Sequence, residues 1–329
     1  EYLGNGYKCM ASYGHLRELK GLTSIDINNN FTPTFNISEN KKQQITKLKI
    51  AIEKSTDVIL ASDDDREGEA IAWHICKIFN LPVKTTKRII FHEITKSALQ
   101  KAVEQYTTLN MDIVHAQHAR QILDIVVGFK LSPILWNKIS YNTKVGLSAG
   151  RCQTPAVRIV YDNQKSIDSS PGKKVYQTIG YFTSKNIPFV LHYNYDNEKT
   201  MSTFLEKSVN HDHIYSCGKV RATIKTPPLP FTTSSLQQMA SNELHYSPKD
   251  TMRLCQTLYE AGHITYMRTD SRTYSSDFVK SALDFIVKNY GKEYKSNDIK
   301  ILTIRGNVKS KKKEKEVSAQ EAHEAIRPT

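Results

Sequence analysis

The spacing of apolar residues in the first third of the chain predicts helices that alternate with buried strands. Apolar residues recur at helical spacing over residues 41–54, which predicts an amphipathic helix. Two short apolar runs follow, TDVILAS at 56–62 and KRIIFHEI at 87–94, as expected of buried parallel strands. A helical pattern comes after each run, at 67–79 and at 95–106. This order predicts a βαβ unit with a parallel sheet.

The pattern becomes helical at Asn110 and changes again near residue 172. A helix over 110–129 is expected to close at PILW, residues 133–136, and another helix is expected behind Pro155. Strand-type patterns fill residues 173–225. The stretch TPPLP then predicts a rigid boundary, because consecutive prolines stiffen the backbone.

Three further helices are predicted after that boundary, at 232–244, 247–261 and 275–291. Ser247, Pro248 and Asp250 form a helix-start signature for the second of them, and Gly262 is expected to end it. The charge run KSKKKEKE at 309–316 is expected to form a mobile loop. The chain therefore divides into four expected domains. These are an α/β domain at 1–108, a helical domain at 109–171, a β-rich domain at 172–226 and a second helical domain at 227–329.

Charge narrows the class of partner. Lys and Arg number 46 against 33 Asp and Glu, which gives a net charge of +13 and favours a polyanionic partner. No apolar run reaches the roughly 18 residues that a membrane-spanning helix needs, so we expect no membrane and prefer nucleic acid. The five cysteines are far apart and form no CxxC motif, so we expect free thiols that act as small apolar fillers in a reducing compartment such as the cytoplasm.

An acidic stretch interrupts this basic chain at ASDDDREGEA, residues 61–70. A helix start would account for some of its carboxylates, and a calcium loop would match its first six positions. The calcium loop fails at its twelfth position, where His74 stands in place of glutamate. We expect instead an open carboxylate site at the C-terminal end of a parallel strand, of the type that suits Mg²⁺. Such a site in a basic protein points to phosphodiester chemistry.

A second candidate stretch is EAGHITYMRTDS, residues 260–271. If it forms a strand, Tyr266, Arg268 and Asp270 share one face. A surface ion pair beside an aromatic residue is the plain alternative. The acidic stretch favours a functional site over that alternative.

Five stretches, in this order, resemble the signatures of type IA DNA topoisomerases. DDDREGEA behind its strand resembles the metal motif of that family's TOPRIM domain. The other four are ARQILDIVVGFKLSPILW, GLSAGRCQTPAVRIV, EAGHITYMRTDS and QEAHEAIRPT. YMRTDS is closer to the topoisomerase I branch, whereas GRCQTP leans toward the topoisomerase III branch. The resemblance implies a multi-domain α+β fold, with an α/β TOPRIM domain and helical and β-arch domains that form part of a ring.

The resemblance also implies a mechanism that relaxes negative supercoils. Tyr266 would attack a DNA phosphodiester and form a 5′-phosphotyrosine, with Arg268 supplying positive charge and Asp270 orienting Arg268. The metal-binding residues implied for Mg²⁺ are Asp63, Asp65 and Glu67, whereas Asp64 falls where the family requires no acid. The remaining residues that match family positions are His323 near the scissile phosphate, Arg151 and Arg120 on the DNA backbone, and His15 beside the site. The implied partners are single-stranded and negatively supercoiled DNA, bound by a monomer.

The chain also departs from the family pattern. The family's strand with a catalytic glutamate and a nearby lysine would lie before YGHLREL, where this chain begins. The chain stops at AHEAIRPT, where the family continues, so we expect an internal fragment that does not itself relax DNA. Two alternatives stay open: another TOPRIM enzyme such as a primase or nuclease, and a non-catalytic nucleic-acid-binding module. The first of these needs no tyrosine at position 266, and the second does not account for the acidic stretch.

Overall fold

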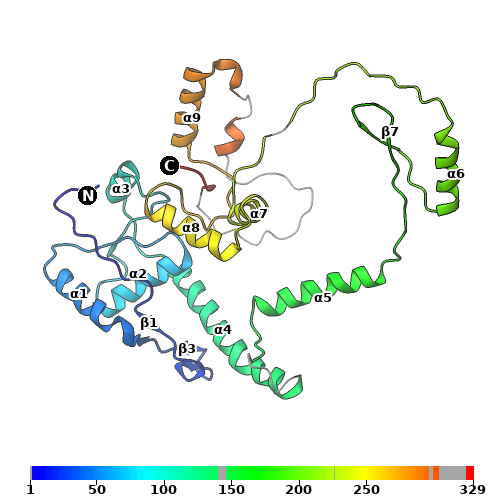
Figure 1. Cartoon of the computed structure of the whole chain (residues 1–329). Coiled ribbons are helices and arrows are strands. Elements are labelled where there is room, and N and C mark those ends of the chain that lie inside the picture. The colour runs from blue at the N-terminus through cyan, green and yellow to red at the C-terminus, as the bar shows by residue number, and fades with distance from the viewer. Residues whose placement is uncertain (1, 140–145, 226, 296–298, 304–323) are drawn as a thin grey trace. The chain divides into compact units, whose positions relative to one another are not determined.

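The computed structural model describes residues 2–139, 146–225, 227–295, 299–303 and 324–329, with side chains 300 and 301 left aside. The chain forms two compact units, one of residues 1–147 with 227–329 and the other of residues 148–226 (Figure 1). The charge run at 309–316 lies outside the described residues. The fold combines helices with short strands and is of the α+β class.

The first unit is mainly helical. Its α-helices are α1 Lys42–Glu53, α2 Arg66–Ile78, α3 Lys96–Glu104, α4 Met111–Lys138, α7 Thr233–Leu244, α8 Pro248–Glu260 and α9 Ser276–Asn289. Its strands are β1 Arg17–Glu18, β2 Ile25–Asp26, β3 Thr32–Pro33, β4 Asn36–Ile37, β5 Ile59–Leu60 and β6 Lys87–Arg88. Short 3-10 helices lie at Leu22–Ser24, Glu39–Lys41, Lys292–Tyr294 and Ile299–Thr303.

The predicted βαβ unit is confirmed. Strands β5 and β6 pair in parallel, and α2 connects them along the chain. Both strands are shorter than the apolar runs predicted, because only Ile59–Leu60 and Lys87–Arg88 are paired as strands. Leu60, at the end of β5, packs with Ala72 and Cys76 of α2 in a buried cluster. This packing places the residues that follow β5 at the start of α2.

Helix α4 does not end where the sequence pattern predicted. It begins after the N-cap Asn110, whose side chain accepts bonds from the amides of Asp112 and Ile113, and it continues through Pro133 to Lys138. A proline removes one intrahelical hydrogen bond and bends a helix, but the flanking turns can carry the helix on. The prediction that PILW closes the helix was therefore wrong.

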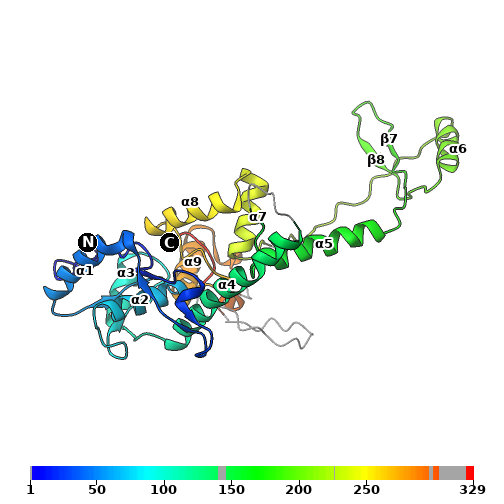
Figure 2. The same ribbon diagram turned by 90° about the horizontal axis from the view of Figure 1, so that it is seen from below.

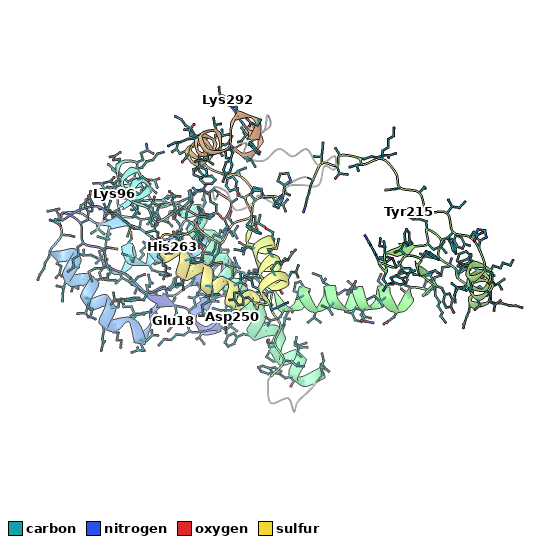
Figure 3. The ribbon with its side chains drawn as sticks, turned by 45° about the horizontal axis from the view of Figure 1, so that its top comes forward. Glu18, Lys96, Tyr215, Asp250, His263 and Lys292 are labelled. Atoms are coloured by element: carbon teal, nitrogen blue, oxygen red, sulfur yellow. The ribbon has the colours of Figure 1, made fainter. Side chains whose placement is uncertain are left out.

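Helix α8 begins and ends where the sequence predicts. Ser247 caps it by accepting a hydrogen bond from the amide of Asp250, and Pro248 is its first residue. Gly262 ends it in a left-handed conformation with φ of 75°, and a Cβ there would crowd the carbonyl oxygen of Ile94. In Figure 3 the labels Asp250 and His263 mark the two ends of this helix. These features fix the point at which the chain leaves α8 toward Tyr266.

The stretch around Tyr266 is not a strand, contrary to the sequence prediction. Ile264 makes one isolated bridge, with Pro328. The following backbone amides bond outside any ladder, from Thr265 to the carbonyl of Arg327 at 3.0 Å and from Tyr266 to that of His92 at 2.8 Å. These partners come from the chain terminus and from the residues after β6. The stretch is extended because it is held between two segments, which local sequence does not reveal.

The second unit also differs from the prediction of strands throughout 173–225. It contains helix α5 at Gln153–Ser169, an antiparallel pair of β7 Ile179–Tyr181 and β8 Pro188–Val190, and helix α6 at Glu198–Val209. Figure 2 shows β7 and β8 side by side as a hairpin. The N-cap Asn197, which binds the amides of Lys199 and Thr200, is the local signal for α6 that the strand prediction overlooked.

The cysteines fulfil the filler prediction only in part. Cys76 and Cys255 are buried thiols, whereas Cys9, Cys152 and Cys217 are exposed and fill no core. In the described part of the chain, no helix has the length and apolar character needed to cross a membrane.

Candidate active site

The acidic stretch forms the junction between β5 and α2. Asp65 is the N-cap of α2, and its Oδ1 accepts a hydrogen bond from the amide of Gly68 at 2.7 Å. The hydroxyl of Ser62 donates to the carbonyl of Gly68 at 2.6 Å. A side chain at position 68 would overlap the carbonyl oxygen of Asp63, so this tight junction requires glycine.

A buried arginine stabilises the junction through hydrogen bonds to its backbone carbonyls. Arg88 of β6 is wholly buried, and it donates to the carbonyls of Ser62 at 2.7 Å and Asp63 at 2.9 Å. Its Nε donates to Oε2 of Glu69 at 3.2 Å, and Oε1 of Glu69 accepts the amide of Asn110 at 2.6 Å. Arg88 was not predicted from the sequence, although a charged residue directly before the apolar residues of a buried strand is a signal for a buried partner.

Tyr266 reaches the acidic stretch directly. Its hydroxyl donates to Oδ2 of Asp65 at 2.6 Å, and Nη1 of Arg268 lies 3.5 Å from the same oxygen. The Tyr266 residue is 2% exposed, whereas the Arg268 side chain is 56% exposed. Burial, followed by the charge of Asp65, raises the pKa of Tyr266, and Arg268 opposes that rise. The tyrosine is therefore a neutral donor in this arrangement.

The carboxylates line a cavity beside this contact. Its volume is about 420 Å³. Burial and then the charge of Asp65 raise the pKa of Asp63, so an added positive charge would favour its ionised form. The lining residues are Asp63, Asp65, Glu67, Gly68, Ile71, Met252, Arg253, Gln256, Met267 and Arg268.

The carboxylate of Glu67 contacts two side chains that lie outside the acidic stretch. Its Oε2 lies 2.9 Å from Nε2 of His15 and accepts a hydrogen bond from the side-chain amide of Gln117 at 3.1 Å. The bond to His15 is the largest cause that lowers the pKa of Glu67, and the charge of Arg120 adds to it. The structure thus brings His15 and Arg120 to the acidic stretch. Gln117 was missed by sequence reasoning, because amides at helix positions give no distinctive signal.

These donors fit a hard divalent cation in chemical type, since carboxylate oxygens are the ligands that Mg²⁺ prefers. Among the described residues, however, no group of three or more His, Cys, Asp or Glu is arranged as a ready metal site. Asp65 and Glu67 are instead bonded to protein donors. The feature that suits a cation is the position of Asp63, Asp65 and Glu67 together on the cavity wall.

The other predicted site residues lie elsewhere. Asp270 is exposed, and Arg268 forms its ion pair with Asp65. Arg151 belongs to the second unit and is half-buried there. His323 lies outside the described residues.

Two buried histidines, His74 of α2 and His118 of α4, lie near the site, and the ring of His74 contacts that of His15. His74 and His118 pack edge-on or tilted around the ring of Phe35, with ring centroids 4.8 Å away in both cases. Burial lowers the pKa of His74 to about 3 and that of His118 to about 4. Neither was singled out from the sequence, because a histidine on a helix face gives no sign of burial.

Known proteins are similar to this chain over its whole length. The sequence pattern of a family described as DNA topoisomerase matches residues 108–329, and that of the Toprim domain matches residues 1–94. DNA topoisomerase 1 of Campylobacter jejuni is 40% identical over 351 residues, covering 100% of this chain and 47% of that protein. DNA topoisomerase 1 of a Synechocystis species is 36% identical over 375 residues, covering 99% of this chain and 39% of that protein.

A solved structure of a topoisomerase is also similar to this chain. Full-length topoisomerase I from Thermotoga maritima superposes with a TM-score of 0.78 at 34% identity, covering 100% of this chain and 52% of that one. The chain spans about half the length of these relatives. The two family matches together with this fold and a tyrosine bonded to the acidic stretch show that the chain belongs to the type IA DNA topoisomerases.

Proposed function

We propose that this chain carries the DNA-cleaving site of a topoisomerase that forms a transient 5′-phosphotyrosine on Tyr266 and rejoins the strand with Mg²⁺. The observation that carries the proposal is the 2.6 Å hydrogen bond from Tyr266 to Asp65, which joins the nucleophile to the acidic stretch. In the whole protein, passage of another strand through the break would relax negative supercoils. The family to which the chain belongs supports this activity.

The covalent step exchanges one phosphodiester for another. The Tyr266 oxygen attacks the phosphorus, and the bond from phosphorus to the 3′ oxygen breaks. The phenolic proton leaves toward Oδ2 of Asp65, which accepts its hydrogen bond. The 3′ oxygen takes up a proton and leaves as a hydroxyl. Because no phosphoester bond is lost overall, rejoining is the reverse reaction.

Positive charge is what the phenol needs, because burial and the carboxylates raise its pKa. Arg268 is proposed to move its exposed guanidinium from Asp65 to the scissile phosphate, where a planar, bidentate donor suits the non-bridging oxygens. Asp270 is proposed to keep Arg268 oriented in that position. The transfer of Arg268 also leaves Asp65 free to receive the phenolic proton.

Asp63, Asp65 and Glu67 are proposed to hold Mg²⁺, and the Toprim match supports this assignment. When bound, Mg²⁺ supplies positive charge that offsets the carboxylates and helps to position the broken ends. His15 is proposed to keep Glu67 oriented through their 2.9 Å contact.

The proposed partner is single-stranded DNA, as well as negatively supercoiled DNA in which single strands open readily. The net charge of +13 supports a polyanionic partner. Arg120, Arg151 and His323 are proposed to contact the DNA backbone. A monomer is sufficient, because the tyrosine and the acidic stretch belong to one unit of one chain.

A trapping experiment tests this function. The chain is incubated with a labelled single strand in which sulfur replaces the bridging 3′ oxygen at one position. A thiolate leaves without needing a proton and rejoins slowly, so a covalent adduct accumulates. We expect denatured protein to carry label on Tyr266. Binding without any adduct would instead favour the non-catalytic nucleic-acid-binding module.

The same experiment addresses the other Toprim enzymes. A primase or nuclease would extend or cut the strand without retaining it. Labelled products that are free of protein, formed while Tyr266 remains unmodified, would favour that reading over the topoisomerase.

A further inference from the structure

A second tyrosine lies behind the candidate nucleophile. Tyr259 is on the buried face of α8 and is 2% exposed. Its ring meets that of Tyr266 edge-to-face, with centroids 5.2 Å apart and an interplanar angle of 67°. Both rings belong to one buried cluster with Cys255, Met267 and Ile326. The backbone of Tyr259 is rigidly set by the helix, so its ring limits where the Tyr266 ring can lie.

The hydroxyl of Tyr259 is unusual for a buried phenol. It is inaccessible to solvent and makes no hydrogen bond among the residues that the structure describes. Buried tyrosine hydroxyls normally find a partner, because an unpaired buried donor is unfavourable. Packing alone does not explain this hydroxyl, since phenylalanine would fill the same space without it.

The charges that act on this hydroxyl come from the acidic stretch. After burial, the carboxylate of Asp63 is the next cause that raises the pKa of Tyr259, and Asp64 and Asp65 follow. Tyr259 in turn acts on Asp63, because its hydroxyl opposes the rise in the pKa of that carboxyl group. A side-chain hydrogen bond between the two groups contributes to both pKa shifts, so the hydroxyl faces Asp63, although the pair does not meet strict hydrogen-bond geometry.

The neighbouring carboxylates already have protein donors. Asp65 accepts from Gly68 and Tyr266, and Glu67 is held by His15 and Gln117. Asp63 has no comparable hydrogen bond to its carboxylate within the described part of the chain, although Arg268 and Arg88 act on it electrostatically. A donor aimed at this one carboxylate is thus a means of orienting it.

We propose that Tyr259 is a positioning residue, whose hydroxyl donates to the ionised carboxylate of Asp63 and whose ring sets the position of Tyr266. This role rests on the proposed function, because it presumes that Asp63 holds Mg²⁺. One oxygen of Asp63 receives the phenolic donor and the other remains directed at the cavity. A single helical side chain thereby aligns the nucleophile and one carboxylate of the acidic stretch, which come from opposite ends of the chain.

Tyr259→Phe tests the role, because it deletes the hydroxyl and keeps the ring. A matched control is Tyr274→Phe, whose ring also makes an edge-to-face pair, with Phe278 at 5.2 Å and 66°. Melting temperature without metal and Mg²⁺ affinity by calorimetry are measured on wild type and both variants. We expect Tyr259→Phe to melt no lower than wild type, because it removes an unpaired buried hydroxyl. We expect its Kd for Mg²⁺ to rise about tenfold, as for loss of a hydrogen bond to a charged group.

The outcomes separate this role from a merely structural one. Weaker Mg²⁺ binding at an unchanged melting temperature, with Tyr274→Phe like wild type, supports the proposal. Equal Mg²⁺ affinity of wild type and Tyr259→Phe, including no binding by either, overturns it. Adduct formation with the sulfur-containing strand is scored separately. A wild-type chain that forms no adduct counts against the proposed function, while a change in Mg²⁺ affinity still identifies Tyr259 as an orienting donor for Asp63.

Discussion

The hydroxyl of Tyr266 donates a 2.6 Å hydrogen bond to Oδ2 of Asp65, a residue 201 positions away in the sequence. Asp65 is also the N-cap of α2, so its carboxylate is held by the amide of Gly68 as well as by the tyrosine. The proposed nucleophile is therefore held against the acidic stretch by a side chain of that stretch.

Replacing Tyr266 by phenylalanine is expected to abolish the covalent adduct with single-stranded DNA. The change removes the oxygen that attacks phosphorus and leaves the ring in its buried cluster. Binding of the same strand is expected to change by less than about twofold, since backbone charge neutralisation dominates affinity. Tyr290→Phe, at an exposed ring, is the control, and adducts formed by Tyr266→Phe would show that another residue is the nucleophile.

The double replacement of Asp63 and Asp65 by asparagine is expected to raise the Kd for Mg²⁺ by at least about tenfold. Two anionic ligands become neutral, whereas the cap of α2 survives because asparagine caps helices as well as aspartate. Rejoining is expected to be impaired, and the first cut is expected to slow as well, because asparagine at position 65 cannot accept the phenolic proton of Tyr266. Asp284→Asn, on the exposed side of α9, is the control. Unchanged Mg²⁺ binding in the double variant would remove the acidic stretch from consideration as a metal site.

Local patterns in the sequence were enough to predict the βαβ unit and the position of the acidic stretch at the end of its first strand. The apolar run into β5 and the helical spacing of α2 place Asp63 and Asp65 at a strand end, and the structure has them there. The cap at Ser247 and the stop at Gly262 were also predicted, because each depends on the chemistry of one or two residues.

Contacts between distant segments could not be predicted in the same way. The stretch around Tyr266 resembles a strand locally, but its amides bond to His92 and Arg327 and no ladder forms. The role of Arg88 depends on carbonyl groups that only the folded junction brings together. Helix α4 continues through Pro133 because the turns on either side hold it, against the local preference of proline.

Arg327 is expected to be essential for stability in the first unit. Its buried guanidinium bonds Glu93 and Glu324, both at 2.9 Å, and lies 4.0 Å from the centroid of the Phe278 ring. Arg327→Met should destabilise the unit by about 3–5 kcal/mol, because both carboxylates lose their charged partner and keep only neutral donors, Thr95 for Glu93 and Ser275 for Glu324. Chemical denaturation measures the loss, with the exposed Arg272→Met as control. A loss below about 1 kcal/mol would mean that water replaces the arginine.

Single-stranded DNA binding by residues 1–329 is expected to weaken steeply with salt. Each neutralised phosphate releases counterions, so the logarithm of the association constant should fall linearly with the logarithm of salt concentration. The chain is not expected to relax a supercoiled plasmid, since the relatives that it matches are about twice as long. A binding titration at several salt concentrations and a plasmid gel with Mg²⁺ measure the two properties. Relaxation by this chain would show that the remaining half of those relatives is dispensable.

Acid is expected to destabilise the first unit through His74 and His118. Their pKa values in the folded chain are about 3 and about 4, below the ordinary value of 6.5. At a pH between the folded and the ordinary pKa values, the unfolded chain binds more protons than the folded chain. The stability from these two histidines is therefore fully present above pH 6.5 and falls as the pH decreases toward 4. Each histidine contributes a slope of about 1.4 kcal/mol per pH unit. Denaturation of wild type and His118→Leu between pH 7 and 4.5 measures the slope, with the exposed His263→Gln as control. If His118→Leu loses stability with acid as steeply as wild type, another group carries the effect, and chemical shifts of the histidine rings across the same range would identify it.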